Sequence, residues 1–277
     1  MTPTDDSDGT HEMTMGSAPD GRDLAGRVAI VTGASRRRGI GAAICRVLAA
    51  RGSDVAFTHW VVADAWDVDP DGPAALEAEL TAIGVRVAAV EVDLSAPEAA
   101  AKVLDQVEAR LGLPSILVNN AAHSTRDGFQ LLDAATLDAH YAVNVRTAAL
   151  LSVGFARRHA ARDTAARLPG RIVNLTSGQG LGAMPGELAY IMTKGAMEAF
   201  TVTLAAEVAP LGITVNAVDP GATDTGWMTP EFQAKLVAGA PMGRVGQPED
   251  AARLVAFLVS DDAGWVTGQV IHSRGGY

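Results

Sequence analysis

Short runs of β-branched and aliphatic residues alternate with longer stretches rich in alanine and leucine from residue 23 onward. The short runs predict buried parallel strands, and the longer stretches predict helices that cover the sheet on both faces. The seven expected strands are Val28–Thr32, Asp54–Thr58, Arg86–Val92, Ile116–Asn119, Arg171–Leu175, Ile213–Val218 and Val270–Ser273. The expected helices are Ile40–Ala50, Pro73–Ile83, Pro97–Leu111, Thr136–Arg162, Glu187–Ala209 and Pro248–Ser260. This alternation predicts an α/β fold of the Rossmann type, with a doubly wound, seven-stranded parallel sheet.

Two stretches interrupt this rhythm. Trp60–Gly72 is an acidic segment, and Thr223–Gly243 contains two prolines and several glycines. The second is the better candidate for a lid, because it follows the carboxyl end of a strand, where open α/β sheets bind ligands. No internal linker is visible, so residues 23–277 are expected to form a single domain. Residues 1–22, rich in Asp, Ser, Thr, Gly and Pro, predict a flexible tail.

Composition narrows the class of protein. The 277 residues are 48% hydrophobic, which is ample for a buried core. A formal net charge of −10 has the wrong sign for a main partner that is nucleic acid or an anionic membrane, so a small-molecule partner is expected. No stretch approaches the roughly 18 apolar residues of a membrane helix. We expect a soluble protein, cytoplasmic by default.

Cysteine and histidine usage speaks against a metal site. The single cysteine, Cys45, excludes an internal disulfide and a cysteine-based metal centre. The six histidines show no spacing typical of metal ligands. We therefore expect no metal ion.

A glycine-rich segment, Thr32–Gly41, follows the first expected strand and leads directly into a helix. It reads T-G-A-S-R-R-R-G-I-G. Glycines at this place let the backbone approach a dinucleotide, whose pyrophosphate lies at the helix N-terminus. The segment therefore predicts a dinucleotide site.

Three successive arginines, Arg36, Arg37 and Arg38, lie within this segment. Beside a nucleotide pocket they favour NADP(H), because a guanidinium group suits the doubly charged 2′-phosphate. NAD-specific sites usually carry an acid at the end of the second strand, but here that strand ends at His59 and Asp64 stands further into the loop. We expect NADP(H), with NAD(H) as the alternative. Which arginine contacts the phosphate is left open.

A tyrosine and a lysine four residues apart, Tyr190 and Lys194, lie near the start of an expected helix. This spacing puts the phenol and the ammonium on one helix face. A nearby cation lowers the pKa of a phenol by favouring the phenolate, so we expect the lysine to activate the tyrosine. Ser177 stands 13 residues before Tyr190, at the end of a strand. These residues predict a proton-transfer site, the alternatives being an exposed helix pair and a capping serine.

The Ser…Tyr-x-x-x-Lys arrangement resembles the short-chain dehydrogenase/reductase family, and the likeness covers nearly the whole chain after Asp23. The family's T-G-x-x-x-G-x-G motif is matched with two extra residues, which we interpret as a local bulge. Further matches are Asp93-Leu94, Asn119–Ala122, Asn144 and Val218–Gly221. Among family branches, the sequence looks closest to 3-oxoacyl-(acyl carrier protein) reductases.

The resemblance implies a role for each catalytic candidate. Ser177 would hold the substrate oxygen, and Tyr190 would donate or accept the proton. Lys194 would tune Tyr190 and bind the nicotinamide ribose, and Asn144 would hold a water of the proton relay. The implied cofactor contacts are Gly33, Ser35, Arg36, Arg37, Arg38, Gly39, Ile40, His59, Asp93, Leu94, Asn120, Ala121, Ala122, Tyr190, Lys194, Pro220, Gly221, Thr223 and Thr225.

The chain also departs from the family pattern. Ala122 replaces the usual glycine, and Arg274 stands before Gly275-Gly276 where an acid is commoner. Leu168 and Leu211 occupy places where a basic residue would suit an acidic carrier protein, so docking of such a carrier is not favoured. The resemblance implies a homotetramer, or less often a dimer.

The substrate is expected to contact residues after Gly221 and Ser177. These include Thr225, Trp227, Met228, Phe232, Met242, Gln179 and Met184. Because they are mixed apolar groups with few charges, a small, neutral or partly apolar carbonyl or secondary alcohol is expected. The alternative to an enzyme is a catalytically silent dinucleotide-binding sensor or scaffold, which need not keep the tyrosine.

Overall fold

The computed structural model describes residues 21–60, 69–163 and 168–276. Within them lies a seven-stranded sheet, ordered β3-β2-β1-β4-β5-β6-β7, in which every neighbouring pair is parallel. The strands are β1 (Val28–Val31), β2 (Asp54–His59), β3 (Val87–Glu91), β4 (Ile116–Asn119), β5 (Gly170–Leu175), β6 (Ile213–Asp219) and β7 (Val270–His272). The Rossmann-type sheet expected from the sequence is confirmed.

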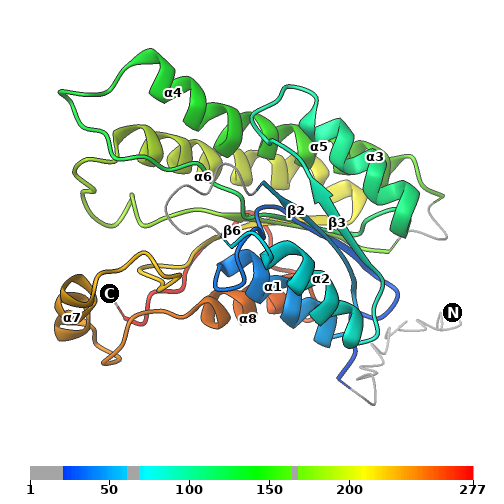
Figure 1. The fold of residues 1–277 in the computed structure, drawn as a ribbon. Coiled ribbons are helices and arrows are strands. Elements are labelled where there is room, and N and C mark those ends of the chain that lie inside the picture. Colours follow the sequence, from blue (N-terminus) through cyan, green and yellow to red (C-terminus); the bar gives the residue numbers. More distant parts are fainter. Residues whose placement is uncertain (1–20, 61–68, 164–167, 277) are drawn as a thin grey trace, which may run out of the picture.

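Helices cover both faces of the sheet (Figure 1). One face carries α1 (Ile40–Ala50), α2 (Gly72–Ala82) and α8 (Pro248–Leu258). The other carries α3 (Ala99–Leu111), α5 (Ala148–Ala160) and α6 (Leu188–Val208). Successive strand side chains enter opposite layers, so Ile30 belongs to one buried cluster and Val31 to the other.

The long helix expected at Thr136–Arg162 is not one regular helix. It consists of α4 (Ala134–Tyr141), a π-helical segment (Ala142–Thr147) and α5. A π-helical turn inserts an extra residue into the helix and is common at functional sites. Asn144 lies within it.

The candidate lid also differs from the expected loop, because it contains α7 (Pro230–Gly239). Thr229 caps this helix, its hydroxyl accepting a hydrogen bond from the Phe232 amide at 3.2 Å, and Pro230 opens the first turn. None of its residues is buried, and it lies to one side of the sheet (Figure 1). The cap and the proline were visible in the sequence, but no apolar face marked a helix.

Two further expectations fall largely outside the described residues. Most of the predicted tail, residues 1–22, is not described, and neither are residues 61–68 of the acidic segment. The end of that segment is described, and Gly72 begins α2. None of the helices in the described part of the chain has the length and apolar character needed to cross a bilayer.

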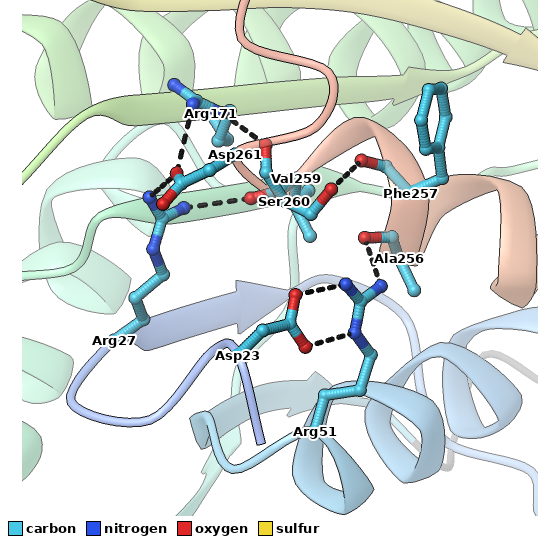
Figure 2. Close-up of polar contacts among 9 residues, drawn as sticks. All are labelled: Asp23, Arg27, Arg51, Arg171, Ala256, Phe257, Val259, Ser260 and Asp261. Atoms are coloured by element: carbon cyan, nitrogen blue, oxygen red, sulfur yellow. Dashed lines mark hydrogen bonds and ion pairs between the residues drawn. The ribbon is translucent and has the colours of Figure 1, made fainter. Parts of the chain in front are cut away.

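The amino-terminal end of the sheet is held by arginines (Figure 2). Arg27, just before β1, and Arg171, in β5, are buried, and both approach the carboxylate of Asp261, at 2.8 and 3.4 Å. Arg27 also donates to the carbonyl of Val259 at 2.8 Å, and Arg171 to that of Ser260 at 3.2 Å. The segment after α8 is thereby fixed to two strands.

Candidate active site

The glycine-rich loop joins the carboxyl end of β1 to the start of α1. Gly33 has φ +74°, a backbone conformation that favours glycine. A Cβ atom at Gly33 would lie 2.6 Å from Ala121 Cα, and one at Gly41 would lie 2.6 Å from Asn120 Nδ2. Both glycines are therefore required for the loop to pack against the segment that follows β4.

Hydrogen bonds of Asn120 and Thr32 fix the glycine-rich loop to the segment that follows β4. The side chain of Asn120 donates to the carbonyls of Thr32 at 2.8 Å and Gly33 at 2.9 Å. In return, the Thr32 hydroxyl accepts from the amides of Asn120 and Ala121, both at 3.0 Å. Asn120 and Ala121, expected beside the cofactor, thus shape the loop, and Ala122 is exposed at the same edge.

The first turn of α1 suits a phosphate group. Gly39 is its N-cap and provides no side-chain hydrogen bond, and no acidic residue stands in the first turn. Backbone amides at a helix N-terminus without a cap remain available to an anion. This feature, together with the two glycines, fits the pyrophosphate of a dinucleotide.

The three arginines of the loop lie in different surroundings. Arg37 forms an ion pair with Asp69 at 3.0 Å, in the segment that leads into α2. Arg36 is half-buried and donates to the carbonyl of Thr225 at 3.5 Å, across to the loop after β6. Arg38 is exposed, and its side chain forms no hydrogen bond or ion pair within the described residues. No local sequence pattern predicts that a carboxylate meets Arg37, because Asp69 is 32 residues away.

The carboxyl ends of β2 and β3 lie beside the glycine-rich loop. The side chain of Ser35 accepts a hydrogen bond from the Trp60 amide at 3.0 Å, and His59 Nδ1 is buried with no hydrogen-bond partner in the described part of the chain. Asp93 and Trp60 line a cavity of about 200 Å³. Leu94, which follows Asp93, is buried.

Ser177, Tyr190 and Lys194 converge at the carboxyl end of β5. Lys194 is buried and donates to the carbonyl of Leu175, the last residue of β5, at 2.7 Å. Its Nζ atom lies 5.4 Å from the centre of the Tyr190 ring. Ser177 is near enough to the Tyr190 phenol to lower its pKa, and its hydroxyl donates to Met184 Sδ at 3.9 Å.

Burial sets the acidity of this pair. Burial raises the pKa of Tyr190 to about 12, Glu187 and Asp219 act in the same direction, and the neighbouring Ser177 hydroxyl opposes them. Burial lowers the pKa of Lys194 to about 8. The expectation that Lys194 lowers the pKa of the phenol is not met, because desolvation is the largest cause of the shift and Lys194 is not among the groups that act on it.

The side chain of Asn144 forms three hydrogen bonds with the protein. Its Oδ1 accepts from the His123 amide at 2.6 Å, and its Nδ2 donates to the His123 carbonyl at 2.9 Å and to Thr193 Oγ1 at 3.0 Å. Both amide hydrogens are therefore used, whereas Oδ1 has a second lone pair that can accept a hydrogen bond from a water, so the relay role stays a prediction. The side chain also connects the π-helical segment, the segment after β4 and α6.

Asp127 is a site residue that sequence reasoning missed. Its carboxylate accepts hydrogen bonds from the amides of Leu188 (2.5 Å) and Ala189 (2.8 Å), at the start of α6. Because α6 carries Tyr190 and Lys194, Asp127 fixes the first turn of the helix that bears both candidate catalytic residues. No local pattern could reveal this cap, since it stands 61 residues before Leu188.

The loop after β6 forms the remaining wall. Gly221 has φ +64°, and its amide donates to Asp219 at 2.9 Å. Pro220 and Gly221 are partly buried, whereas Thr223 and Thr225 are buried. The carbonyl of Thr223 accepts a hydrogen bond from the Trp227 indole at 2.9 Å.

Across the described residues, no group of three or more His, Cys, Asp or Glu side chains is placed to hold a metal ion.

Comparison with known proteins agrees with this geometry. A family model described as Enoyl-(Acyl carrier protein) reductase matches residues 33–277. A protein described as the uncharacterized oxidoreductase YjdA of Bacillus subtilis (strain 168) is 52% identical over 251 residues, which cover 91% of this chain and 96% of the relative. The chain belongs to the short-chain dehydrogenase/reductase family. It is therefore an oxidoreductase, for which a small-molecule substrate is implied.

Other members of the family are similar over the same length. The 3-oxoacyl-(acyl-carrier-protein) reductase FabG of Pseudomonas aeruginosa is 38% identical, with 91% of this chain and 98% of the relative covered. The structure of a short-chain dehydrogenase from Burkholderia cenocepacia J2315 in complex with NADP is 33% identical and superposes with a TM-score of 0.80, with 92% of this chain and 98% of that one covered. The family resemblance seen in the sequence is thus confirmed.

Proposed function

We propose that the protein is an NADP(H)-dependent oxidoreductase that interconverts a carbonyl group and a secondary alcohol. The observation that carries the proposal is the convergence of Ser177, Tyr190 and Lys194 at the carboxyl end of β5. By resemblance to the family, the bound nicotinamide supplies or accepts the hydride.

The three side chains have complementary roles in this proposal. Negative charge develops on the substrate oxygen as the carbonyl is reduced, and hydroxyl groups of Ser177 and Tyr190 stabilise that charge. Tyr190 is protonated at neutral pH and can donate its proton to the oxygen. Lys194 places a positive charge beside the resulting phenolate. Asn144 would hold a water of the proton relay, as the family resemblance implies, and its side chain fixes Thr193 of α6.

Replacement of the tyrosine tests this function. We expect Tyr190→Phe to lower turnover by about 100-fold or more, because the variant lacks the proton that general acid catalysis supplies. Consumption of NADPH by absorbance, over a panel of ketones and aldehydes, is the measurement. Tyr141→Phe is the matched control, because Tyr141 is exposed. Undiminished turnover in Tyr190→Phe would show that the assigned mechanism is wrong, whereas NADPH binding without turnover of any carbonyl would favour a silent sensor.

Cofactor choice rests on the arginine-bearing loop. We propose that Arg38, with Arg36, meets the 2′-phosphate, since Arg37 is already paired with Asp69. The similar Burkholderia protein was solved with NADP, which supports this choice. His59, Asp93 and Leu94 would face the adenosine half, and Pro220, Gly221, Thr223 and Thr225 the nicotinamide half.

Fluorescence titration with NADPH and NADH tests this assignment. Wild-type protein should bind NADPH more tightly, and Arg38→Ala should weaken NADPH about tenfold or more while leaving NADH unchanged. Arg37→Ala is the control and should change the preference less. Equal affinity of the wild type for the two cofactors would contradict the assignment.

We further propose a small, partly apolar substrate. Trp227 and Phe232, whose ring centres are 5.5 Å apart, form an apolar wall over the loop after β6.

We also propose that residues 23–277 act as one domain within a cytoplasmic homotetramer. Exposed apolar side chains on α5 and α6, Leu150 and Val202, support the assembly, which light scattering would measure.

A further inference from the structure

A cavity of about 240 Å³ lies at the carboxyl ends of β6 and β7, beside the start of α8. Pro220, on the loop after β6, lines it, so it adjoins the candidate active site. Three arginines also line it, Arg244, Arg253 and Arg274, together with the carboxylate of Asp250. A cavity with this composition is suited to an anion.

The carboxylate in the wall does not neutralise the cavity. Asp250 forms two hydrogen bonds with Arg244, at 2.6 and 3.0 Å, and its Oδ1 lies 3.7 Å from Arg253. Behind the cavity, buried Asp219 accepts from the Gly221 amide at 2.9 Å and lies 2.9 Å from His272 Nδ1. Asp219 is 3.7 Å from Arg274 Nε, too far for a hydrogen bond. Three cations thus face two carboxylates.

Arg274 connects the cavity with the catalytic strand. Its side chain crosses the backbone of Gly221, where a Cβ would lie 3.0 Å from Arg274 Cγ. Its guanidinium reaches Gly178, where a Cβ would lie 2.4 Å from Nη1. Gly178 directly follows Ser177, so the positive charge lies next to the residue that we propose to hold the substrate oxygen. This arginine is also the one that replaces the commoner acid before Gly275-Gly276.

Two side chains next to Gly178 have buried polar atoms that lack a hydrogen-bond partner in the described residues. One is Arg274, at Nε, and the other is Gln179, at both Nε2 and Oε1. Gln179 directly follows Gly178. Buried polar groups usually have hydrogen-bond partners, so these atoms mark a place where a ligand supplies them.

We propose that Arg274 and Gln179 bind a carboxylate group of the substrate, which makes the physiological substrate an oxo acid or the corresponding hydroxy acid. The inference rests on the proposed carbonyl reductase function and restricts its substrate class. The sequence expectation of a neutral or partly apolar substrate then holds only for the part that faces Trp227 and Phe232. A planar carboxylate matches the guanidinium fork, whereas an ester of the same size cannot form the ion pair.

Direct binding tests the carboxylate site without turnover. Isothermal titration with pentanoate in the presence of NADP should show saturable binding to wild type. Arg274→Gln should weaken that binding about tenfold or more, and Arg274→Lys should weaken it less, because the charge remains while the fork is lost. Arg157→Gln is the control, because Arg157 is an exposed arginine of α5 far from this cavity in sequence. No pentanoate binding, or tighter binding of inorganic phosphate, would overturn the proposal.

Turnover of matched substrates tests specificity. Oxo acids of four to eight carbons, each compared with its methyl ester, should give wild-type kcat/KM values about tenfold or more higher for the acid. Arg274→Gln should remove that preference, with KM for the acid rising about tenfold or more relative to KM for the ester. Equal loss for acid and ester would instead indicate a general structural role and overturn the assignment.

The two proposals fail in different ways. If pentanoate binds through Arg274 but no carbonyl compound is reduced, the proposed function is wrong and the carboxylate site stands. If ketones and esters are reduced without any preference for acids, the function stands and the carboxylate site is wrong.

Discussion

At the residue scale, Tyr190 and Lys194 show how one environment acts in opposite directions on two titratable groups. Burial disfavours the charged form of each, so it raises the pKa of the phenol and lowers that of the ammonium. Tyr190 consequently retains its proton across the physiological range, as a proton donor for reduction must. Lys194, in contrast, begins to lose its charge in slightly alkaline solution.

The rate of carbonyl reduction should therefore fall as the pH rises through about 8, the pKa of Lys194. Above this pH the lysine becomes neutral and no longer stabilises the tyrosinate formed by proton donation. Profiles of kcat/KM between pH 6 and pH 10 would measure the decline. Lys194→Arg stays charged, so whatever activity it retains should decline less over that range. A wild-type profile that is flat to pH 10 would contradict a catalytic role for the lysine charge.

At the scale of elements, the catalytic groups depend on how separate helices and loops are fixed to one another. Asn144 attaches the π-helical segment to Thr193 of α6, and Asp127 caps the same helix from the segment after β4. Lys194 attaches α6 to the end of β5. The position of the tyrosine is thus determined by contacts outside its own helix.

Loss of the α6 cap should affect catalysis as well as stability. Asp127→Asn should lower the free energy of unfolding by about 1 to 2 kcal/mol, since it removes a charged cap that holds two backbone amides. It should also lower kcat, because the turn before Tyr190 is no longer fixed.

The matched control is Asp133→Asn at the N-cap of α4, where the carboxylate accepts from the Thr136 amide. Denaturant unfolding and steady-state kinetics measure both variants. Asp133→Asn should lower stability by a similar amount with little change in kcat. If the two variants changed kcat equally, Asp127 would have no special role in positioning the catalytic helix.

At the scale of the whole molecule, the candidate active site lies at one end of the sheet and a cluster of stabilising ion pairs lies at the other. The carboxyl ends of the strands bear the glycine loop, the candidate catalytic side chains and the candidate lid. The amino ends carry buried Arg27 and Arg171, whose shared carboxylate comes from Asp261 after α8 (Figure 2). The side chain of Asp261 is 78% exposed although both arginines are buried, so solvent screens part of this interaction.

Asp261→Asn should lower the free energy of unfolding by about 1 to 3 kcal/mol, because two buried guanidinium groups lose their counter-charge. Because the carboxylate is exposed, the expected loss of unfolding free energy is smaller than for a fully buried ion pair. Thermal and denaturant unfolding provide the measurement. Asp262→Asn, at the neighbouring exposed position, should change stability by less than about 0.5 kcal/mol. Similar losses in both variants would show that Asp261 does not hold the strands through its charge.

The sequence by itself determined the sheet, most helix positions and the family. Alternation of apolar runs and the order of the glycine loop, Ser177 and Tyr190-x-x-x-Lys194 are local signals, and each is readable within a few residues. The missed features, α7 and the π-helical segment at Asn144, depend on weaker signals. A capped helix without a buried face leaves little periodicity, and an extra residue in a helical turn leaves none.

Only the tertiary structure decided which distant groups meet. It placed Asp69 on Arg37, Asp127 on the start of α6 and Arg274 beside Gly178. It also decided the direction of the Tyr190 pKa, because desolvation depends on everything packed around the phenol. Such effects act through space between segments far apart in the chain, so no spacing of residues along the sequence could reveal them.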